Sequence, residues 1–198
     1  MARLNDRFPR LFTPGRIGRL TVANRIVMLP MTMGYSEADG SVGDRFITYF
    51  AERAKGGAGL IIIPFTPLYA GSHMAPGVFD DRYLPGIRRL TDALRANGAK
   101  TVCQLITAYQ MVFGDGPPEW VGPSAVPNRM MRGTPRALTI GEIQELVEGY
   151  GKAAGRACRG GFDAVEFIVG AGYLLNRFLS PITNRRDDRY GGSLENRM

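Results

Sequence analysis

The chain has few of the residues that build metal sites and covalent cross-links. Among its 198 residues are two cysteines, Cys103 and Cys158, and one histidine, His73. A disulfide framework and a Cys/His zinc site both need more of these side chains, so we expect neither, and no bound metal. Two unpaired cysteines are typical of a reducing compartment, and we expect a cytoplasmic location.

Long hydrophobic runs are also missing. The longest, near residues 60–64, has the length of a strand, whereas a membrane-spanning helix needs about 20 apolar residues. We therefore expect no membrane partner. The composition, with 44% hydrophobic and 22% charged residues, is that of a globular protein.

Lysine is scarce. The 25 basic residues are 22 arginines and three lysines, Lys55, Lys100 and Lys152. The net charge is +7, but the arginines are spread along the whole chain, with local clusters over 3–25 and 185–189. A nucleic-acid-binding surface concentrates its basic residues on one face or along one helix. We therefore expect no nucleic-acid partner, and favour a basic pocket for a cofactor or a small-molecule substrate.

Short, almost continuously apolar segments predict four buried strands. They lie at 26–29, 60–63, 101–106 and 164–168. Strands of this kind are typical of a parallel sheet covered on both faces. Before the first of them, residues 17–22 predict a small hairpin that plugs one end of a barrel.

Amphipathic helices are predicted between these strands, over 44–55, 85–96 and 140–159. Each ends at a Gly-Gly or Asn-Gly pair that leads into the next strand. The last helix opens with Thr139 and Glu142, which have the spacing of a capping box. Three such joints indicate a β/α repeat, and right-handed crossovers then give a parallel sheet, so the fold class is α/β.

The connections that follow the strands are long. They span 30–42, 64–82, 107–137 and 169–192, and the third exceeds 30 residues. Ligands of parallel α/β folds gather at the carboxyl ends of the strands. A loop longer than about 15 residues is usually functional or disordered, so these connections are the predicted site.

Four stretches of sequence carry a family resemblance. They are LFTPGRIG at 11–18, NRIVMLPMT at 24–32, YFAERAKGG at 49–57 and GYLLNRFLSPITNRRDDRYGGSLENR at 172–197. Together they resemble the Old Yellow Enzyme family of FMN-dependent ene-reductases, and the last looks like that family's long signature almost letter for letter. The resemblance covers essentially the whole chain, and the 2,4-dienoyl-CoA reductase-like branch of the family is included in it.

The resemblance implies a (β/α)8 TIM barrel with FMN at the carboxyl-terminal mouth. The hairpin and about four β/α units correspond to the amino-terminal half of such a barrel, and complete barrels typically have about 250 residues. We therefore expect residues 1–198 to form a single partial TIM-barrel, FMN-binding domain, truncated after the fourth strand. Its open first and fourth strands predict self-association or a homo-oligomer.

Five residues resemble those that contact the flavin in the family: backbone groups of Leu29, Pro30 and Met31, the hydroxyl of Thr32, and the carboxamide of Gln104. One amide both donates and accepts hydrogen bonds, which suits the pyrimidine edge of FMN. Taken without the resemblance, Thr32 is equally a turn cap, and Gln104 a satisfied polar residue at a strand end.

Tyr173 matches the family's tyrosine that protonates the alkene substrate, although a packing role is the alternative. The implied function is hydride transfer from NAD(P)H through FMN to an activated alkene, either an enone or an enoyl-CoA-like molecule. One departure nearby is Phe65, which replaces a small residue that commonly lies near the flavin.

Ile168 and Ala171 stand where most of the family has a histidine and then a histidine or asparagine, both donating to the substrate carbonyl. Losing one such donor costs roughly 100- to 1000-fold in rate. An alternative is therefore a catalytically inactive half-barrel that cannot hold FMN by itself. A Rossmann-type nucleotide binder, suggested by Gly170 and Gly172, is disfavoured because Leu175 replaces the third glycine of the motif.

Overall fold

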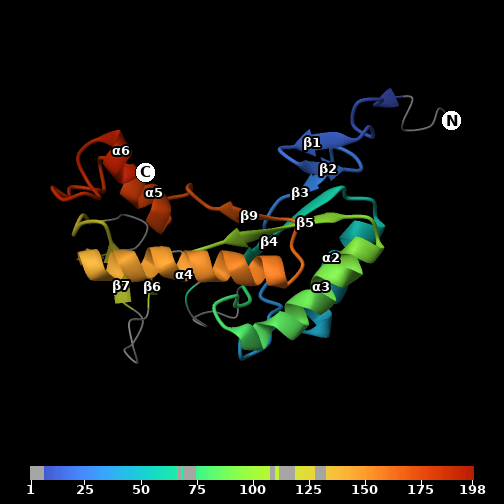
Figure 1. The fold of residues 1–198 in the computed structure, drawn as a ribbon, viewed down its shortest axis with the longest axis horizontal. Coiled ribbons are helices and arrows are strands. Elements are labelled where there is room, and N and C mark those ends of the chain that lie inside the picture. Colours follow the sequence, from blue (N-terminus) through green and yellow to red (C-terminus); the bar gives the residue numbers. More distant parts are fainter. Residues whose placement is uncertain (1–6, 67, 69–74, 108–109, 112–118, 128–132) are drawn as a thin grey trace.

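The computed structural model describes residues 7–66, 68, 75–107, 110–111, 119–127 and 133–198. Its centre is a four-stranded parallel sheet with the strand order β3-β4-β5-β9 (Figure 1). The strands are β3 (Val27–Met28), β4 (Leu60–Phe65), β5 (Lys100–Leu105) and β9 (Ala164–Phe167). Each of the four predicted strands is present, and the order follows the sequence, as successive β/α units require.

Three helices cover one face of this sheet (Figure 1). They are α2 (Asp44–Lys55), α3 (Leu84–Ala96), which follows the short 3-10 helix η1 (Asp81–Tyr83), and α4 (Ile140–Arg159). Alternate residues of each strand pack against them, because side chains of a strand point to opposite faces in turn. The buried side chains between sheet and helices include Phe46, Phe50, Ile61, Ile63, Phe65, Ile87, Leu90, Cys103, Leu105, Leu146 and Ala153.

The ends of α4 are fixed by local sequence. The Thr139 hydroxyl accepts from the backbone N–H of Glu142, and the Glu142 carboxylate accepts from the backbone N–H of Thr139 at 2.7 Å. The predicted capping box is therefore confirmed. At the other end the chain turns at Gly160 and Gly161, and Gly161 has a φ of +92°, which favours glycine.

The predicted hairpin is confirmed as β1 (Gly15–Ile17) paired with β2 (Leu20–Val22). Val22 packs with Leu60, Ile62 and Val102 on the sheet face opposite the helices. Since Leu60 begins β4, the hairpin covers the amino ends of the strands on this face. The carboxyl ends lie at the other end of the sheet, where the chain continues into α5 (Leu174–Leu179) (Figure 1).

The segment 107–137 was predicted as a loop, and this prediction was wrong in part. It contains a small sheet of β6 (Gln110–Met111), β7 (Glu119–Gly122) and β8 (Arg136–Ala137). These strands have two to four residues, which is too short for a period-2 pattern to stand out in the sequence.

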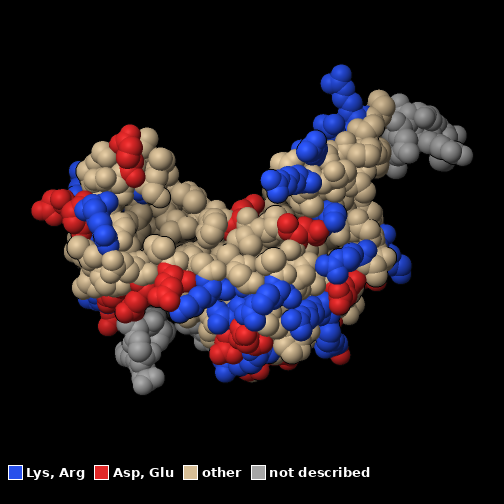
Figure 2. Space-filling model, viewed as in Figure 1, with Lys and Arg blue, Asp and Glu red and all other residues tan. Residues whose placement is uncertain are grey.

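The molecule is hollowed between two raised parts, the β1–β2 hairpin and the carboxyl-terminal segment with α5 and α6 (Leu194–Arg197) (Figure 2). The floor of this hollow is the sheet face that no helix covers. On the opposite side, basic and acidic side chains alternate over the helices in the same view. In the described part of the chain, no helix is long and apolar enough to cross a membrane.

Candidate functional site

The structure brings the predicted site residues to one edge of the sheet. Residues 29–32 follow β3, Gln104 lies near the end of β5, and Tyr173 follows β9. The strands are parallel and neighbouring, so their carboxyl ends meet at the same edge. This edge is the mouth of the partial barrel, where its ligands are expected.

The segment after β3 is irregular and open to solvent. Leu29 is 70% exposed and Met31 is 56% exposed, Thr32 is also exposed, and Pro30 is half-buried. Apolar side chains left exposed at the carboxyl end of a strand mark a surface that is suited to a ligand or to another part of a protein.

Gln104 and Glu166 lie on the face of the sheet that no helix covers, which we call the open face. The two residues are opposite each other in the register of β5 and β9, and Gln104 donates from Nε2 to Glu166 Oε1 at 2.5 Å. Gln104 is 4% exposed. Below the pair, towards the hairpin, the same face is apolar, with Ile62, Val102 and Ala164 in contact.

Sequence reasoning missed Glu166. The signal was present, because Glu166 interrupts an otherwise apolar strand at the position that shares a face with Ala164 and Ile168. What the sequence does not give is the register that places it beside Gln104.

Tyr173 sits at the end of a tight turn and is the N-cap residue of α5. Its backbone N–H donates to the Gly170 carbonyl at 3.1 Å, and Ala171 and Gly172 both have positive φ, +54° and +73°. Asn176 closes the turn, since its side chain accepts from the Gly172 N–H and donates to the Val169 carbonyl. The half-buried Tyr173 side chain is therefore carried on a well-anchored backbone.

A second set of contacts anchors the start of α5 to the end of β5. The backbone N–H of Leu174 donates to the Thr107 carbonyl at 3.2 Å, and the Tyr150 hydroxyl of α4 donates to Thr107 Oγ1 at 2.8 Å. Burial raises the pKa of Tyr150 to about 12, so its hydroxyl stays protonated and remains a donor. Thr107 thereby joins β5, α4 and the segment that carries Tyr173.

The long signature segment is held mainly by buried polar groups. Arg177 is 1% exposed and donates from Nη1 to the Val121 carbonyl of β7 at 2.9 Å. Asn184 donates to the carbonyls of Phe178 and Tyr190. Arg186 donates to the carbonyls of Pro123 and Leu138, and it also holds the pKa of Asp188 below its usual range. Several polar residues of the signature thus fix a loop against the β6–β8 sheet.

The structure shows on which face of the sheet two departures from the family pattern, Ile168 and Phe65, lie. Ile168 is half-buried and follows the same alternation as Glu166, so it belongs to the open face. Phe65, which replaces a small residue of the family pattern, is fully buried on the helix side, with its ring centroid 5.4 Å from that of Phe162 and 6.4 Å from that of Phe46. Phe65 alternates with Pro64 along β4, so its side chain points away from the open face.

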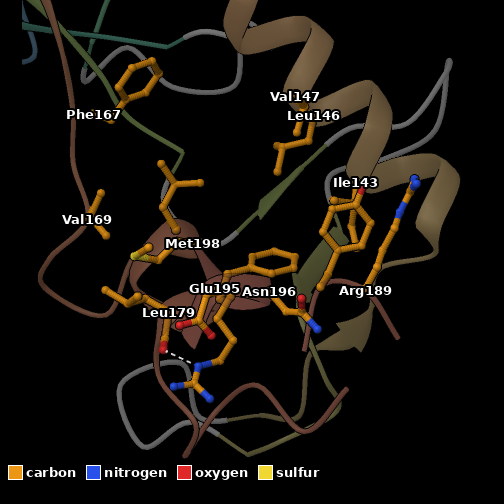
Figure 3. A pocket seen from close by; sticks show the side chains of 14 residues that line it. Ile143, Leu146, Val147, Phe167, Val169, Leu179, Arg189, Glu195, Asn196 and Met198 are labelled. Atoms are coloured by element: carbon orange, nitrogen blue, oxygen red, sulfur yellow. Dashed lines mark hydrogen bonds between the residues drawn. The ribbon is translucent and has the colours of Figure 1, made fainter. Parts of the chain in front are cut away.

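A cavity of about 630 Å³ lies elsewhere, between α4 and the α5–α6 segment (Figure 3). Val147, Phe167, Val169 and Met198 are among its lining residues. Phe167 alternates with Glu166 along β9, so this cavity is on the helix side of the sheet and is separate from the predicted site.

Among the described residues, no group of three or more His, Cys, Asp or Glu side chains could hold a metal ion. His73, the chain's single histidine, lies outside the described residues.

The comparison with protein families decides how this arrangement is classified. Residues 10–198 match the model of the NADH:flavin oxidoreductase / NADH oxidase family. The chain belongs to this family. Membership indicates FMN and NAD(P)H as the cofactors, and it confirms the resemblance on which the sequence analysis relied.

Curated relatives within the family are longer than this chain. A metal reductase of Desulforamulus reducens is 45% identical over 192 residues, which are 95% of this chain and 28% of the relative. An NADPH dehydrogenase of Bacillus licheniformis is 40% identical over 192 residues, or 95% of this chain and 56% of the relative. The chain thus spans between about a quarter and just over half of their lengths.

Solved structures of the family show the same fold. A 2-naphthoyl-CoA reductase in complex with 2-naphthoyl-CoA superposes with a TM-score of 0.88 at 33% identity, over 96% of this chain and 32% of that one. An old yellow enzyme homologue from Zymomonas mobilis gives a TM-score of 0.82 at 35% identity, over 96% and 56%. The predicted partial (β/α)8 barrel is therefore confirmed.

Proposed function

We propose that residues 1–198 form a single partial-barrel domain that supplies the flavin-facing part of an FMN-dependent oxidoreductase of the Old Yellow Enzyme type. It transfers hydride from NAD(P)H to an activated alkene. The observation that carries the proposal is the meeting of residues 29–32, Gln104 and the Tyr173 turn at one edge of a parallel sheet, in a chain of this family.

The residues at this edge fit an FMN ring, which needs polar partners along its pyrimidine edge and an apolar wall elsewhere. Gln104 offers a carboxamide, and Ile62 and Val102 make the neighbouring face apolar. Leu29, Pro30, Met31 and Thr32 would contact the ring from the exposed segment after β3. When bound, FMN supplies the capacity to accept and deliver a hydride, which these side chains lack.

Tyr173 is the proton donor in this proposal. A phenol can act as a general acid when it reaches the carbon that must be protonated. The Gly170–Tyr173 turn and the Leu174–Thr107 hydrogen bond fix the backbone that carries it. The ring is half-buried, so it remains accessible to a small molecule at the mouth.

The substrate we favour is an enoyl-CoA-like thioester rather than a simple enone. The side chains of Ile168 and Ala171 have no hydrogen-bond donor for a substrate carbonyl, so in this proposal the substrate is polarised by other groups. The 2-naphthoyl-CoA reductase to which the chain is similar supports a thioester, because 2-naphthoyl-CoA belongs to this chemical class.

A second candidate is that this chain by itself is inactive and does not retain FMN. Two observations favour it. The sheet beneath the hollow in Figure 2 has β3 and β9 as its outer strands in the described part of the chain. The chain also spans only 28% and 56% of the lengths of two relatives. Self-association through these outer strands would be the accompanying behaviour. The cytoplasmic location stays a prediction from cysteine content.

The test of the proposed reaction uses the chain loaded with FMN under anaerobic conditions. We expect NADH or NADPH to bleach the flavin absorbance, and an enoyl-CoA to restore it faster than cyclohexenone does. Tyr173→Phe should slow the restoration by at least about 100-fold without slowing the bleaching, because only the second step needs the proton donor. Tyr49→Phe, on α2, is the matched control. Bound FMN that neither nicotinamide bleaches would contradict the proposal.

A further inference from the structure

The only described hydrogen bond of the Gln104 side chain is the one to Glu166. It joins Nε2 of Gln104 to Oε1 of Glu166 at 2.5 Å across neighbouring strands in register. Both residues belong to the regular part of the sheet, where the backbone is fixed by the ladder between β5 and β9. The pair is thus held from both sides.

The chemistry of the two side chains determines which end of the Gln104 amide faces Glu166. A carboxylate has acceptors and no donor, so it takes the NH2 end of the Gln104 amide and not the carbonyl end. The Gln104 carbonyl oxygen is thereby turned away from Glu166 and is left as an acceptor. A neutral side chain at position 166 would not impose this choice.

A contribution to the stability of the fold does not explain the Gln104–Glu166 pair. A buried amide beside a half-buried carboxylate costs free energy that apolar side chains of similar size would not. The neighbouring row of this face, on the hairpin side of the pair, consists of Ile62, Val102 and Ala164, which shows that this face tolerates apolar packing.

We propose that Glu166 is a positioning residue, which fixes the Gln104 amide so that its carbonyl oxygen is presented to the imide N–H of the FMN pyrimidine ring. The presentation of Gln104 to FMN rests on the proposed function. The orientation of Gln104 by Glu166 does not depend on it. Glu166 itself makes no contact with the ring in this account.

The orientation is tested without flavin, by the side-chain amide signals of Gln104 in the 15N-labelled chain, assigned with Gln104→Leu. We expect one of the two Nε2 protons to be shifted downfield and to exchange slowly. In Glu166→Leu both protons should move to ordinary positions, whereas the surface control Glu148→Gln should leave them unchanged. Identical Gln104 signals in the original chain and in Glu166→Leu would overturn the positioning role.

The presentation to flavin is tested by binding FMN and 3-methyl-FMN, in which the imide N–H is replaced. The original chain should bind FMN at least about tenfold more tightly, the typical effect of one hydrogen bond lost in a buried site. The ratio should fall towards one in Glu166→Leu and in Gln104→Leu, and take an intermediate value in Glu166→Gln, whose amide permits both orientations.

Glu148→Gln should keep the full ratio. A merely structural role for Glu166 would weaken both flavins equally and leave the ratio unchanged, which would overturn the inference. If the original chain binds neither flavin, the proposed function fails for this chain, and the amide signals alone decide whether Glu166 orients Gln104.

Discussion

Ala171 occupies a backbone conformation that alanine rarely adopts. Within the described residues it is the one non-glycine with positive φ, at +54°. The left-handed conformation costs roughly 1–2 kcal/mol for a residue with a Cβ atom, and glycine or asparagine adopt it more easily. Ala171 therefore strains the turn that carries Tyr173, and its side chain has no hydrogen-bond donor.

Replacing Ala171 by glycine should stabilise the chain. We expect Ala171→Gly to raise the free energy of unfolding by about 1 kcal/mol, because the strain is relieved by more than the added chain entropy costs. Urea unfolding measures this. The matched control Ala51→Gly, inside α2, should lower stability by about 0.5–1 kcal/mol. An equal loss in both variants would show that the turn is not strained.

At the residue scale, the sequence predicted which side chains gather at the mouth, but not what holds them. Residues 29–32, Gln104 and Tyr173 follow strands that could be recognised from their apolar runs. Glu166 acquires its role from the register of two strands that are 62 residues apart, and no local pattern reveals such a register. The roles of these residues towards FMN stay predictions.

At the scale of elements, α3 and α4 are joined by a cluster of charges around Asp81. This carboxylate accepts from Arg159 and Arg156 at 2.7–2.9 Å. These two guanidinium groups lower the pKa of Asp81 to about 2. The cluster links η1, just before α3, to the last turn of α4.

Asp81→Asn should therefore change how stability depends on pH. The pKa in the folded chain lies below the usual value near 4, so the contribution is fully present above about pH 4 and is lost as the pH falls towards 2. We expect a shallower loss of stability over this window in Asp81→Asn, seen in urea midpoints against pH. Asp92→Asn, at an exposed position of α3, is the control. Parallel profiles for the original chain and Asp81→Asn would rule out the link.

The β6–β8 sheet is attached to α5 by a tightly packed arginine. A Cβ atom on Gly122 would lie 2.3 Å from Nη2 of Arg177, and this guanidinium is too buried to move aside. We expect Gly122→Ala to destabilise the chain by about 1–3 kcal/mol, as overpacking does.

The matched control is Gly151→Ala, in the middle of α4 with open space around it. It should stabilise the chain by about 0.5–1 kcal/mol. Chemical denaturation distinguishes the two variants. A Gly122→Ala chain as stable as the original would mean that β7 is not packed against Arg177 in solution.

Elements were predictable where their signals are local. The bounds of α2 and α4 agree with the prediction because apolar spacing, caps and terminal glycines all lie within the helix and its flanks. The β6–β8 sheet was missed because its short strands depend on contacts with Arg177 and Arg186, which lie about 50 residues further along the chain.

At the scale of the whole molecule, the central sheet does not close: among the described residues, no further strand pairs with β3 at one edge or with β9 at the other. β3 and β9 are edge strands, and apolar side chains near them are exposed, with Val27 at 39%, Phe167 at 47% and Val169 at 45%. Uncovered parallel strands are unusual, because such sheets are normally closed or covered by helices. This open architecture is the main physical difference between the chain and a complete barrel.

Self-association is the expected consequence. We predict that the apparent mass on a sizing column rises with concentration, and that Phe167→Lys together with Val169→Lys reduces the rise, because charges at a sheet edge oppose pairing. A pair of lysines at the exposed positions Glu145 and Glu148 of α4 is the control. A mass that stays monomeric at all concentrations would contradict this prediction.

The most direct test of the account is whether this chain retains FMN through Gln104. The 198-residue chain is mixed with FMN, freed of excess and passed over a sizing column while flavin absorbance is recorded. We predict that flavin elutes with a discrete protein peak, and that Gln104→Leu elutes at the same volume with most of the flavin lost. Flavin that washes away from the original chain, or that stays equally with Gln104→Leu, would contradict the proposed site.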